Sequence, residues 1–211
     1  MNRITFLIDG FNIYHSILQL KRNTGYCTKW LDLNSLCRSY LHLFGKNASI
    51  QSIYYFSAIP FYLSSQNPSK IKRHKAYLSC LESTGIKIIL GRFKEKHVFC
   101  DYCRNMILKH EEKETDVSMA ITLMEIFLKN ICDKAVIMSG DTDLSPVIRK
   151  CQSLFPEKKI IFAFPYARKN KELSKLAPGS FSIGKKQYIR HQFPNPCILN
   201  NGTEIFKPKS W

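Results

Sequence analysis

Four aspartates stand at the edges of apolar segments, a position from which side chains can meet in one crevice. Asp9 closes the first apolar segment, Asp141 and Asp143 follow a later one, and Asp116 begins an amphipathic helix pattern. Carboxylates that gather closely repel each other and raise each other's pKa unless a cation neutralises them. Hard oxygen donors in this number suit Mg²⁺ or Mn²⁺, which activate water at phosphoesters. The residues therefore predict metal-dependent chemistry on a phosphodiester.

Helix capping is the competing explanation for two of these carboxylates. Asn12 falls in the first turn of the helix that follows Asp9, so Asp9 could serve only as the N-cap of that helix. Pro146 fits a helix only in its first turn, which makes Asp143 an N-cap candidate as well. Asp141 precedes that second helix, and capping does not readily explain it.

Asp116 is the strongest of the candidates because of the helical spacing that follows it. The apolar stripe that it heads continues through Met119, Ala120, Leu123 and Phe127, and the polar face runs through Ser118, Thr122, Glu125 and Lys129. A charge on the inward side of a helix is costly unless it meets a cation or a donor. We therefore expect Asp116 to face the crevice, and we interpret Glu111, Glu112 and Glu114 as solvated or structural.

Short segments rich in Ile, Val, Phe and Tyr alternate with amphipathic segments along the chain. The expected strands are residues 4–8, 50–57, 86–90, 135–139, 159–164 and, more weakly, 180–183. The expected helices are residues 11–21, 34–44, 68–83, 116–130, 144–154 and 171–176. This alternation predicts an α/β fold with a parallel sheet covered on both faces. The functional crevice of such a sheet lies outside the carboxyl ends of its strands, where the aspartates stand.

One domain over residues 1–184 accounts for this pattern, and two segments depart from it. Residues 92–113 form an insertion between a strand and a helix. Residues 185–211 form a basic tail with three prolines, which we expect to pack irregularly or to stay mobile.

The overall charge of the chain favours a polyanionic partner. The 211 residues include 32 Lys and Arg against 16 Asp and Glu, a formal net charge of +16. Such a surface attracts nucleic acid, the commonest polyanion of a cytosol, although simple solubility would also explain it. No apolar run reaches the roughly 18 residues of a membrane span, and the first residues lack a signal peptide. We expect a cytoplasmic protein that begins at Met1 and has no membrane partner.

Three motifs together resemble the NYN domain, a PIN-like nuclease family that includes the LabA/DUF88 proteins. They are Phe6-Leu-Ile-Asp9-Gly-Phe-Asn12-Ile-Tyr-His15, Glu112-Lys-Glu-Thr-Asp116-Val and Ser139-Gly-Asp141-Thr-Asp143-Leu, and the resemblance covers residues 3–184. It implies a Rossmannoid three-layer α/β/α sandwich and a metal-dependent ribonuclease that leaves a 5′-phosphate. Gly91-Arg-Phe-Lys and the pair Cys100 and Cys103 are similar to the LabA-like branch.

The resemblance also implies a role for each matching residue. Asp9, Asp116 and Asp141 would hold Mg²⁺ or Mn²⁺, Asp143 would assist, and Asn12 would orient a water or a phosphate oxygen. Two alternatives stay open. One is a non-catalytic RNA-binding or regulatory module, and the other is a phosphatase or a nuclease that prefers DNA, because carboxylates alone do not choose among phosphoesters.

The insertion contains a candidate zinc site. Cys100 and Cys103 have the Cys-x₂-Cys spacing of tetrahedral Zn²⁺ sites, and His97 and His110 could complete a Cys₂His₂ set. A structural Zn²⁺ would stabilise an otherwise unsupported segment, and a homodimer could share the site across chains. Reduced thiols without metal are the competing interpretation.

Basic residues near a strand end favour contact with RNA. Arg168 and Lys169 follow the segment Phe164-Pro-Tyr166, which should rim the same crevice. Aromatic and basic residues that alternate suit single-stranded RNA, whose bases can stack on rings. We expect Arg168 and Lys169 to contact substrate, although such charge runs are usually solvated faces.

Overall fold

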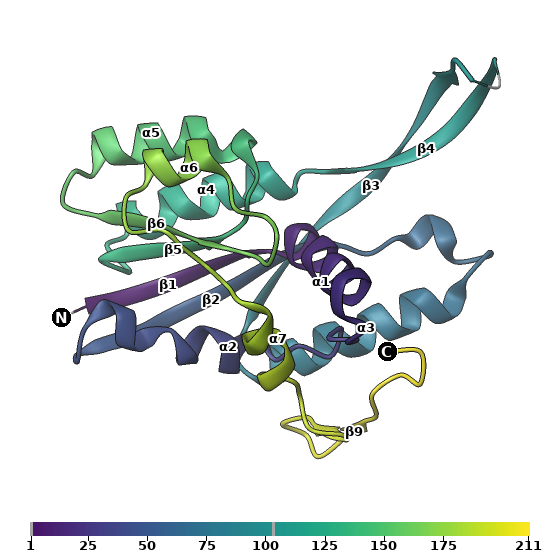
Figure 1. The fold of residues 1–211 in the computed structure, drawn as a ribbon, viewed down its shortest axis with the longest axis horizontal. Helices are drawn as coiled ribbons and strands as arrows, with labels where there is room; N and C mark the ends of the chain where they lie inside the picture. Colours follow the sequence, from purple (N-terminus) through teal and green to yellow (C-terminus); the bar gives the residue numbers. More distant parts are fainter. Residues whose placement is uncertain (1, 103) are drawn as a thin grey trace.

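The computed structural model describes residues 2–102 and 104–211, so the expected start Met1 and the candidate ligand Cys103 lie outside the described residues (Figure 1). The strands of its main sheet are β1 (Asn2–Asp9), β2 (Ala48–Ala58), β3 (Lys87–Cys100), β4 (Asn105–Lys113), β5 (Lys134–Met138), β6 (Lys159–Phe164) and β7 (Phe181–Ser182). The helices are α1 (Gly10–Thr24), α2 (Leu33–Ser39), α3 (Pro68–Ser83), α4 (Thr115–Leu128), α5 (Ser145–Leu154), α6 (Lys171–Leu176) and α7 (Lys185–Arg190). Short 3₁₀ turns η1 (Leu41–Phe44), η2 (Phe61–Leu63) and η3 (Thr142–Leu144) complete these elements, and strands β8 (Cys197–Ile198) and β9 (Glu204–Ile205) form a separate hairpin.

The sheet has the strand order β4-β3-β2-β1-β5-β6-β7. Every neighbouring pair is parallel except β3 and β4, which are antiparallel. The chain winds outward from β1 through β2 to β3, then returns to place β5 on the other side of β1. The carboxyl ends of β1 and β5 are therefore adjacent at a switch point, the place where α/β sheets bind their ligands.

Helices cover both faces of the sheet, as the alternation predicts. The side chains of Ile4, Phe6 and Ile8 pack with α1, α2, α3 and α7 in one apolar cluster. Leu7 points to the opposite face and packs with α4, α5 and α6 in a second cluster. Because both faces of the sheet are buried at β1, the sequence of this strand is mostly apolar rather than alternating. Figure 1 shows the resulting three layers, which confirm the expected α/β/α sandwich.

The expected helices are present, with differences at their ends. Helices α3 and α6 have the expected bounds, and Pro146 lies in the first turn of α5 as anticipated. The pattern over residues 34–44 divides into α2 and the 3₁₀ turn η1. On α4 the expected polar face is wrong at Thr122, which is buried and donates its hydroxyl hydrogen bond to the carbonyl of Ser118.

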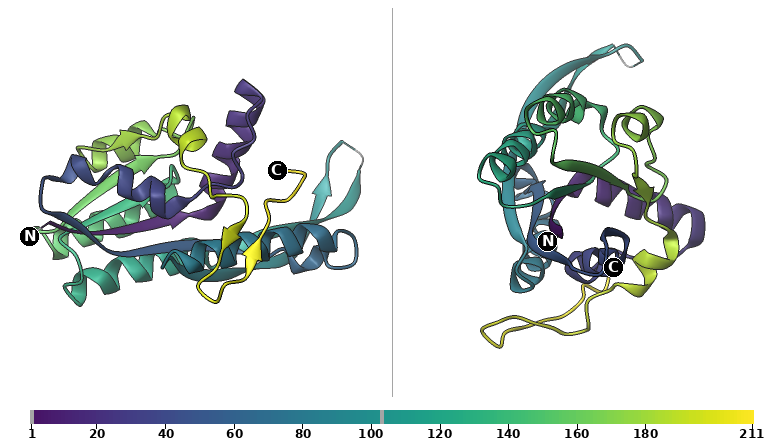
Figure 2. Two further views of the ribbon diagram at one scale, coloured as in Figure 1. Left: turned by 90° about the horizontal axis from the view of Figure 1, so that it is seen from below. Right: turned by 90° about the vertical axis from the view of Figure 1, so that its left-hand side faces the viewer.

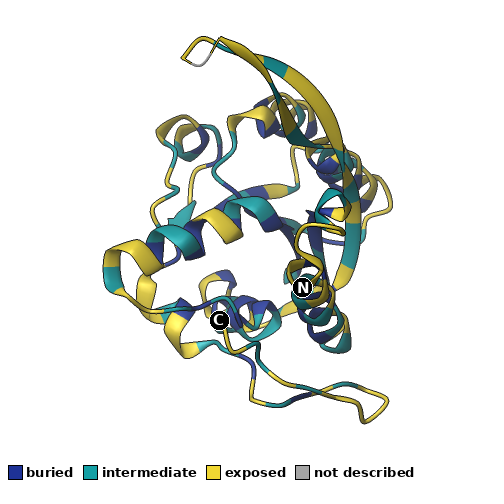
Figure 3. Cartoon of the chain, turned by 90° about the vertical axis from the view of Figure 1, so that its right-hand side faces the viewer, coloured by how far each residue is buried: buried dark blue, intermediate teal, exposed yellow. Residues whose placement is uncertain are grey.

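The insertion forms a long antiparallel hairpin. Strand β3 continues past the expected end of its segment, and the pairing with β4 runs from Arg92 opposite Lys113 to Cys100 opposite Asn105. The hairpin extends away from the body of the molecule (Figure 1) and is exposed over most of its length (Figure 3). Its many charged residues obscure the strand pattern in the sequence.

The tail over residues 185–211 packs on the rest of the molecule and is irregular outside three short elements. The segment contains α7 and the β8–β9 hairpin, and Tyr188, Phe193 and Cys197 are buried. The Tyr188 and Ser16 hydroxyl oxygens share a hydrogen bond of 2.7 Å. The segment lies over the side of the molecule that carries α2 and α3 (Figure 2). Its few apolar residues complete a core that the preceding elements leave open, which its charge and prolines conceal.

The model bears on two further expectations. Cys80, Cys132 and Cys151 are buried, as expected of small apolar side chains. Among the described residues, no helix has both the length and the apolar character needed to cross a membrane.

Candidate active site

Asp9 lies at the centre of the switch point and is almost fully buried, with 3% of its surface exposed. Its Oδ1 accepts from the backbone N–H of Asn12 at 2.9 Å, so it does cap α1. Its Oδ2 accepts from Asn12 Nδ2 at 2.6 Å and from Ser139 Oγ at 2.8 Å. Burial raises the pKa of the carboxyl group, and these three donors oppose that rise. Capping and a role in the site are therefore compatible.

Asn12 connects the ends of β1 and β5. Its Nδ2 donates to Asp9, and its Oδ1 accepts from the backbone N–H of Gly140 at 3.2 Å. The amide group is thus engaged by the protein at both ends. We interpret Asn12 as a residue that positions Asp9 and the turn after β5, rather than one that acts chiefly on a water or a phosphate oxygen.

Asp141, not Asp143, is the capping residue after β5. The backbone N–H of Asp143 donates to Asp141 Oδ1 at 3.0 Å, which makes Asp141 the N-cap of η3. Asp143 lies inside that turn and is exposed, and the residue that precedes α5 is Leu144. The anticipated N-cap role of Asp143 is wrong because the 3₁₀ turn comes before the helix.

Asp116 lies in the first turn of α4 and faces the same aspartates. Its pKa is raised to about 6, chiefly by burial and then by repulsion from Asp9, Asp141 and Asp143. Asp116 is exposed to solvent rather than buried on the inward side of α4, where its helical spacing had placed it. The four expected aspartates therefore act on one another electrostatically.

Glu112, which we interpreted from the sequence as solvated or structural, belongs to the same group. It lies on β4, is half-buried, and accepts a short hydrogen bond from Thr115 Oγ1. Its pKa is raised to about 7, chiefly by burial and further by Asp9 and Asp116, against the effect of the Thr115 donor. The motif that contains Asp116 begins at Glu112, which is the one signal in the sequence that could have drawn attention to it.

A tight junction between the hairpin and α4 holds Glu112 and Asp116 in place. Glu114 adopts a left-handed backbone conformation with φ of 79°, and its Oε1 pairs with Arg92 Nε at 2.6 Å. A Cβ atom at Gly91 would lie 2.6 Å from the carbonyl oxygen of Lys113. Only glycine permits this approach of β3 to the end of β4.

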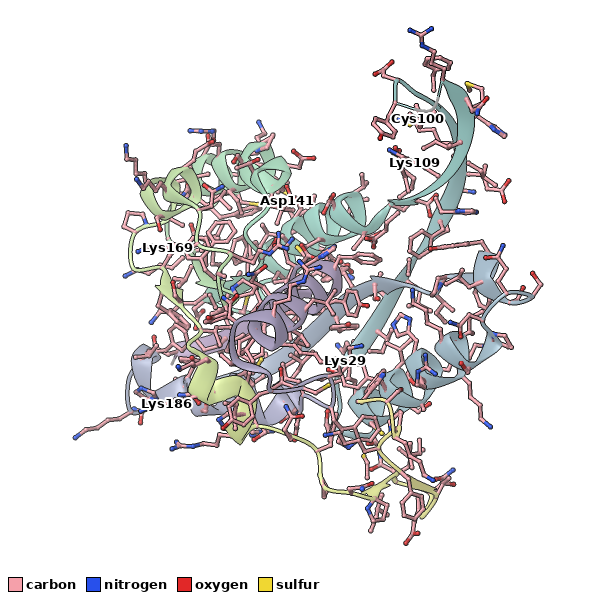
Figure 4. The ribbon with its side chains drawn as sticks, turned by 45° about the vertical axis from the view of Figure 1, so that its right-hand side comes forward. Lys29, Cys100, Lys109, Asp141, Lys169 and Lys186 are labelled. Atoms are coloured by element: carbon pink, nitrogen blue, oxygen red, sulfur yellow. The ribbon has the colours of Figure 1, made fainter. Side chains whose placement is uncertain are left out.

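Arg168 lies beside the turn after β5. Its backbone packs so closely on Gly140 that a Cβ atom there would overlap the Arg168 carbonyl oxygen. The positive charge of Arg168 also lowers the pKa of His15 on α1, after the larger effect of burial. Lys169 is exposed, and Figure 4 labels it on the same side of the molecule as Asp141. The loop thus supplies cations next to the carboxylates.

The described candidate zinc ligands, His97, Cys100 and His110, do not gather in one place. Cys100 lies at the far end of the hairpin, away from Asp141 (Figure 4). His97 and Cys100 are three positions apart on β3, so their side chains leave the strand on opposite faces. The His110 ring stacks on Tyr62 at 3.7 Å between ring centres. Within residues 2–102 and 104–211, no three His, Cys, Asp or Glu side chains are arranged to hold a metal ion. Cys103 lies outside the described residues.

The aspartates and Glu112, hereafter the acidic cluster, nevertheless fit a divalent cation by their chemistry. The members of the acidic cluster are Asp9, Glu112, Asp116, Asp141 and Asp143. They offer hard oxygen donors, and mutual repulsion contributes to the raised pKa of three of them. A cation would relieve that repulsion. In the part of the chain that the structure describes, no three of these side chains are yet arranged closely enough to hold an ion.

A doubly wound parallel sheet with an acidic cluster at its switch point is consistent with a PIN-like α/β domain. The family model of the NYN domain matches residues 3–183. The chain belongs to the NYN domain family, as its motifs predict.

Two individual proteins are similar to the chain. The 6-hydroxy-3-succinoylpyridine 3-monooxygenase HspA of Pseudomonas putida (strain DSM 28022 / S16) is 25% identical over 241 residues, which cover 99% of this chain and 75% of that protein. A crystal structure of a Vibrio parahaemolyticus RIMD 2210633 protein of unknown function, VPA0982, superposes with a TM-score of 0.58 and 16% identity, covering 87% of this chain and 94% of that one. The second likeness shows the fold alone.

Proposed function

We propose that the protein is a metal-dependent ribonuclease whose acidic cluster hydrolyses RNA phosphodiester bonds. The observation that carries the proposal is that carboxylates from β1, β4, α4 and the β5–α5 turn lie near one edge of the sheet, close enough to interact electrostatically, in a chain of net charge +16. Membership of a PIN-like nuclease family supports the same class of reaction. The affinity for RNA, the metal and the cytoplasmic location are parts of this proposal.

Each residue of the acidic cluster has a defined task in the proposal. Asp9, Asp116 and Asp141 would hold Mg²⁺ or Mn²⁺, with Asp143 assisting at the exposed edge. The ion would supply positive charge and a lowered pKa for bound water. Asn12 and Ser139 keep Asp9 oriented through their hydrogen bonds.

Glu112 is suited to proton transfer. Its half-buried carboxyl group lies beside Asp9 and Asp116, where it could accept a proton from an attacking water or return one. Arg168 and Lys169 would hold the phosphate backbone beside the cluster, because cations replace the counterions of the polyanion. Single-stranded RNA is favoured because its unpaired bases can stack on aromatic rings beside these cations.

The curated relative supports a second candidate function. Its printed name describes a monooxygenase that acts on a succinoylpyridine, an aromatic acid. A cavity lined by aromatic and basic residues lies next to the acidic cluster, and such a cavity suits an aromatic anion. The ribonuclease remains our first choice because the acidic cluster is unsuited to binding an anion without a cation.

Cleavage assays with several substrates test the proposal. Labelled single-stranded RNA, duplex RNA and single-stranded DNA would each be incubated with the protein and Mn²⁺, then again with EDTA. We expect cleavage of single-stranded RNA that EDTA abolishes. Equal cleavage of DNA would assign a general nuclease, and RNA binding without cleavage by the wild-type protein would assign a binding module. Either result contradicts the ribonuclease.

A further inference from the structure

A cavity of about 270 Å³ lies beside the first turns of α1. Helices α1 and α3, the end of β2 and the base of the hairpin surround it. Phe11, Tyr14, Tyr62 and Phe93 are among its lining residues. We call it the aromatic cavity. The proposed function does not yet use it.

The rings of the aromatic cavity form a connected wall. Phe93 makes edge contacts with Phe11 at 5.8 Å and with Tyr62 at 5.2 Å between ring centres. Tyr62 is itself held by its stack on His110. Aromatic rings of this kind stack on nucleic-acid bases, whichever base is present. The base of the hairpin therefore contributes a ring to the cavity wall.

Three cations line the same cavity. Lys29, Lys70 and Arg73 come from two different parts of the chain. The pKa of Lys29 is lowered, chiefly by burial, and Arg73 and Lys70 add to this by repulsion. In the part of the chain that the structure describes, none of the three forms an ion pair with a carboxylate. Cations that repel each other at a cavity favour an anionic ligand there.

The aromatic cavity adjoins the acidic cluster through Gly10 and Tyr55. Gly10 lines the cavity and directly follows Asp9, and a Cβ atom there would lie 2.7 Å from the Tyr55 hydroxyl oxygen. Asp9 and Glu112 both interact electrostatically with Tyr55, whose pKa is raised chiefly by burial. One turn of chain thus separates an anion-repelling crevice from an anion-attracting cavity.

We propose that the aromatic cavity is a subsite for one nucleotide, with the base among the rings and a phosphate at Lys29, Lys70 and Arg73. Its volume lies just below the roughly 300–1,000 Å³ of sites for drug-sized ligands, which suits one nucleotide and not an oligonucleotide. The assignment to the RNA substrate rests on the proposed function, whereas nucleotide binding itself does not.

Binding of 5′-AMP in EDTA tests the subsite. AMP would be titrated calorimetrically into the wild-type protein and into Arg73→Gln, Tyr14→Ala and Lys72→Gln. Arg73 and Tyr14 line the cavity, whereas Lys72 is an exposed cation on the same helix α3 and does not. We expect Arg73→Gln and Tyr14→Ala each to weaken binding about tenfold, and Lys72→Gln to change it less than about twofold. Circular dichroism would confirm that each variant is folded.

Three further probes define the chemistry of the ligand. Adenosine, inorganic phosphate and pyridine-3-carboxylate would be titrated in the same way, and we expect each to bind more weakly than AMP. Pyridine-3-carboxylate binding more tightly than AMP would overturn the nucleotide assignment in favour of a small aromatic acid. AMP binding that is absent, or that Arg73→Gln and Lys72→Gln weaken equally, would also overturn it.

The titration is independent of nuclease activity. It contains no divalent ion and measures no cleavage, so an inactive protein can still bind AMP. Equally, a protein that does not bind AMP can still cleave RNA in the assay with Mn²⁺. Failure of the subsite and failure of the ribonuclease are therefore distinguishable.

Discussion

Replacing Asp116 with asparagine tests how much the charge of this residue destabilises the folded protein, because the substitution removes the charge and keeps the side-chain volume. The pKa of Asp116 is about 6 against an ordinary 3.8, so its ionised form is held in an unfavourable place. Taken in full, that difference corresponds to about 3 kcal/mol at neutral pH. Because Asp116 is exposed, solvent screening reduces this free-energy difference. We expect Asp116→Asn to stabilise the metal-free protein by about 1 kcal/mol, or about 2–4 °C in Tm.

The pH dependence of this gain has a defined sign. An acid whose pKa is raised on folding disfavours the folded state wherever it is ionised. The difference in stability between Asp116→Asn and the wild type is therefore complete above about pH 7. It shrinks as the pH falls through about 6 and disappears below 3.8, where the folded and unfolded states are both protonated.

The assay is thermal unfolding followed by circular dichroism, first in EDTA and then with added Mn²⁺. If the acidic cluster binds the ion, Mn²⁺ at ten times its dissociation constant stabilises the wild type by about 1.4 kcal/mol. Asp116→Asn should gain much less from Mn²⁺ and should not cleave RNA. Glu125→Gln is the matched control, because Glu125 lies on the same helix α4, is exposed and pairs with exposed Lys129.

Three results would refute the reasoning. Asp116→Asn could be less stable than the wild type in EDTA, which would mean that the carboxylate is a structural partner and not a strained charge. Mn²⁺ could stabilise Asp116→Asn and the wild type equally, which would place any bound ion elsewhere. Full RNA cleavage by Asp116→Asn would remove this residue from the proposed chemistry.

Two further substitutions test the support of the site, and a third tests an ion pair at the opposite end of the same strands. Asn12→Ala leaves Asp9 and the N–H of Gly140 each without one partner, and should cost about 1–3 kcal/mol in urea unfolding and reduce cleavage. Gly140→Ala forces a Cβ atom against the backbone of the β6–α6 loop, so we expect destabilisation and a loss of RNA cleavage together. Asp133→Asn removes the pair with Arg3 that lowers the Asp133 pKa to about 2. It should cost about 1 kcal/mol near neutral pH, and acid titration of unfolding should show that difference vanish as the pH falls from about 4 through 2.

The switch point can be predicted from the sequence because the residues that mark it lie close in the chain to the strands that position them. Asp9 and Asp141 follow buried strands within a few residues, and a parallel sheet brings such strand ends to one edge. The register confirms this, since Ile8 pairs with Met138. Asp116 is likewise marked by the helix that it begins.

Glu112 could not be placed in the same way, because its position depends on a distant pairing. Only the register of β4 on β3, in which Glu112 lies opposite Phe93, fixes it next to the cluster. The burial of the tail could not be predicted from the sequence for a related reason. Tyr188 is buried by its contact with Ser16, 172 residues earlier in the chain, and no local pattern records a contact of that range.

The hydrogen bonds that hold Asp9 add to the β1–β5 pairing that joins the two halves of the sheet. Ser139 belongs to the end of β5, and Asn12 links α1 to the turn after β5. The carboxylate of Asp9 is therefore held by β1 and β5, two strands with buried side chains. A movement of either strand would disrupt the two apolar clusters that cover the sheet. Rigid support of this kind is what a repelling cluster requires, because its members would otherwise move apart. The fold thus keeps the carboxylates near each other while it places the cations of the aromatic cavity one turn away.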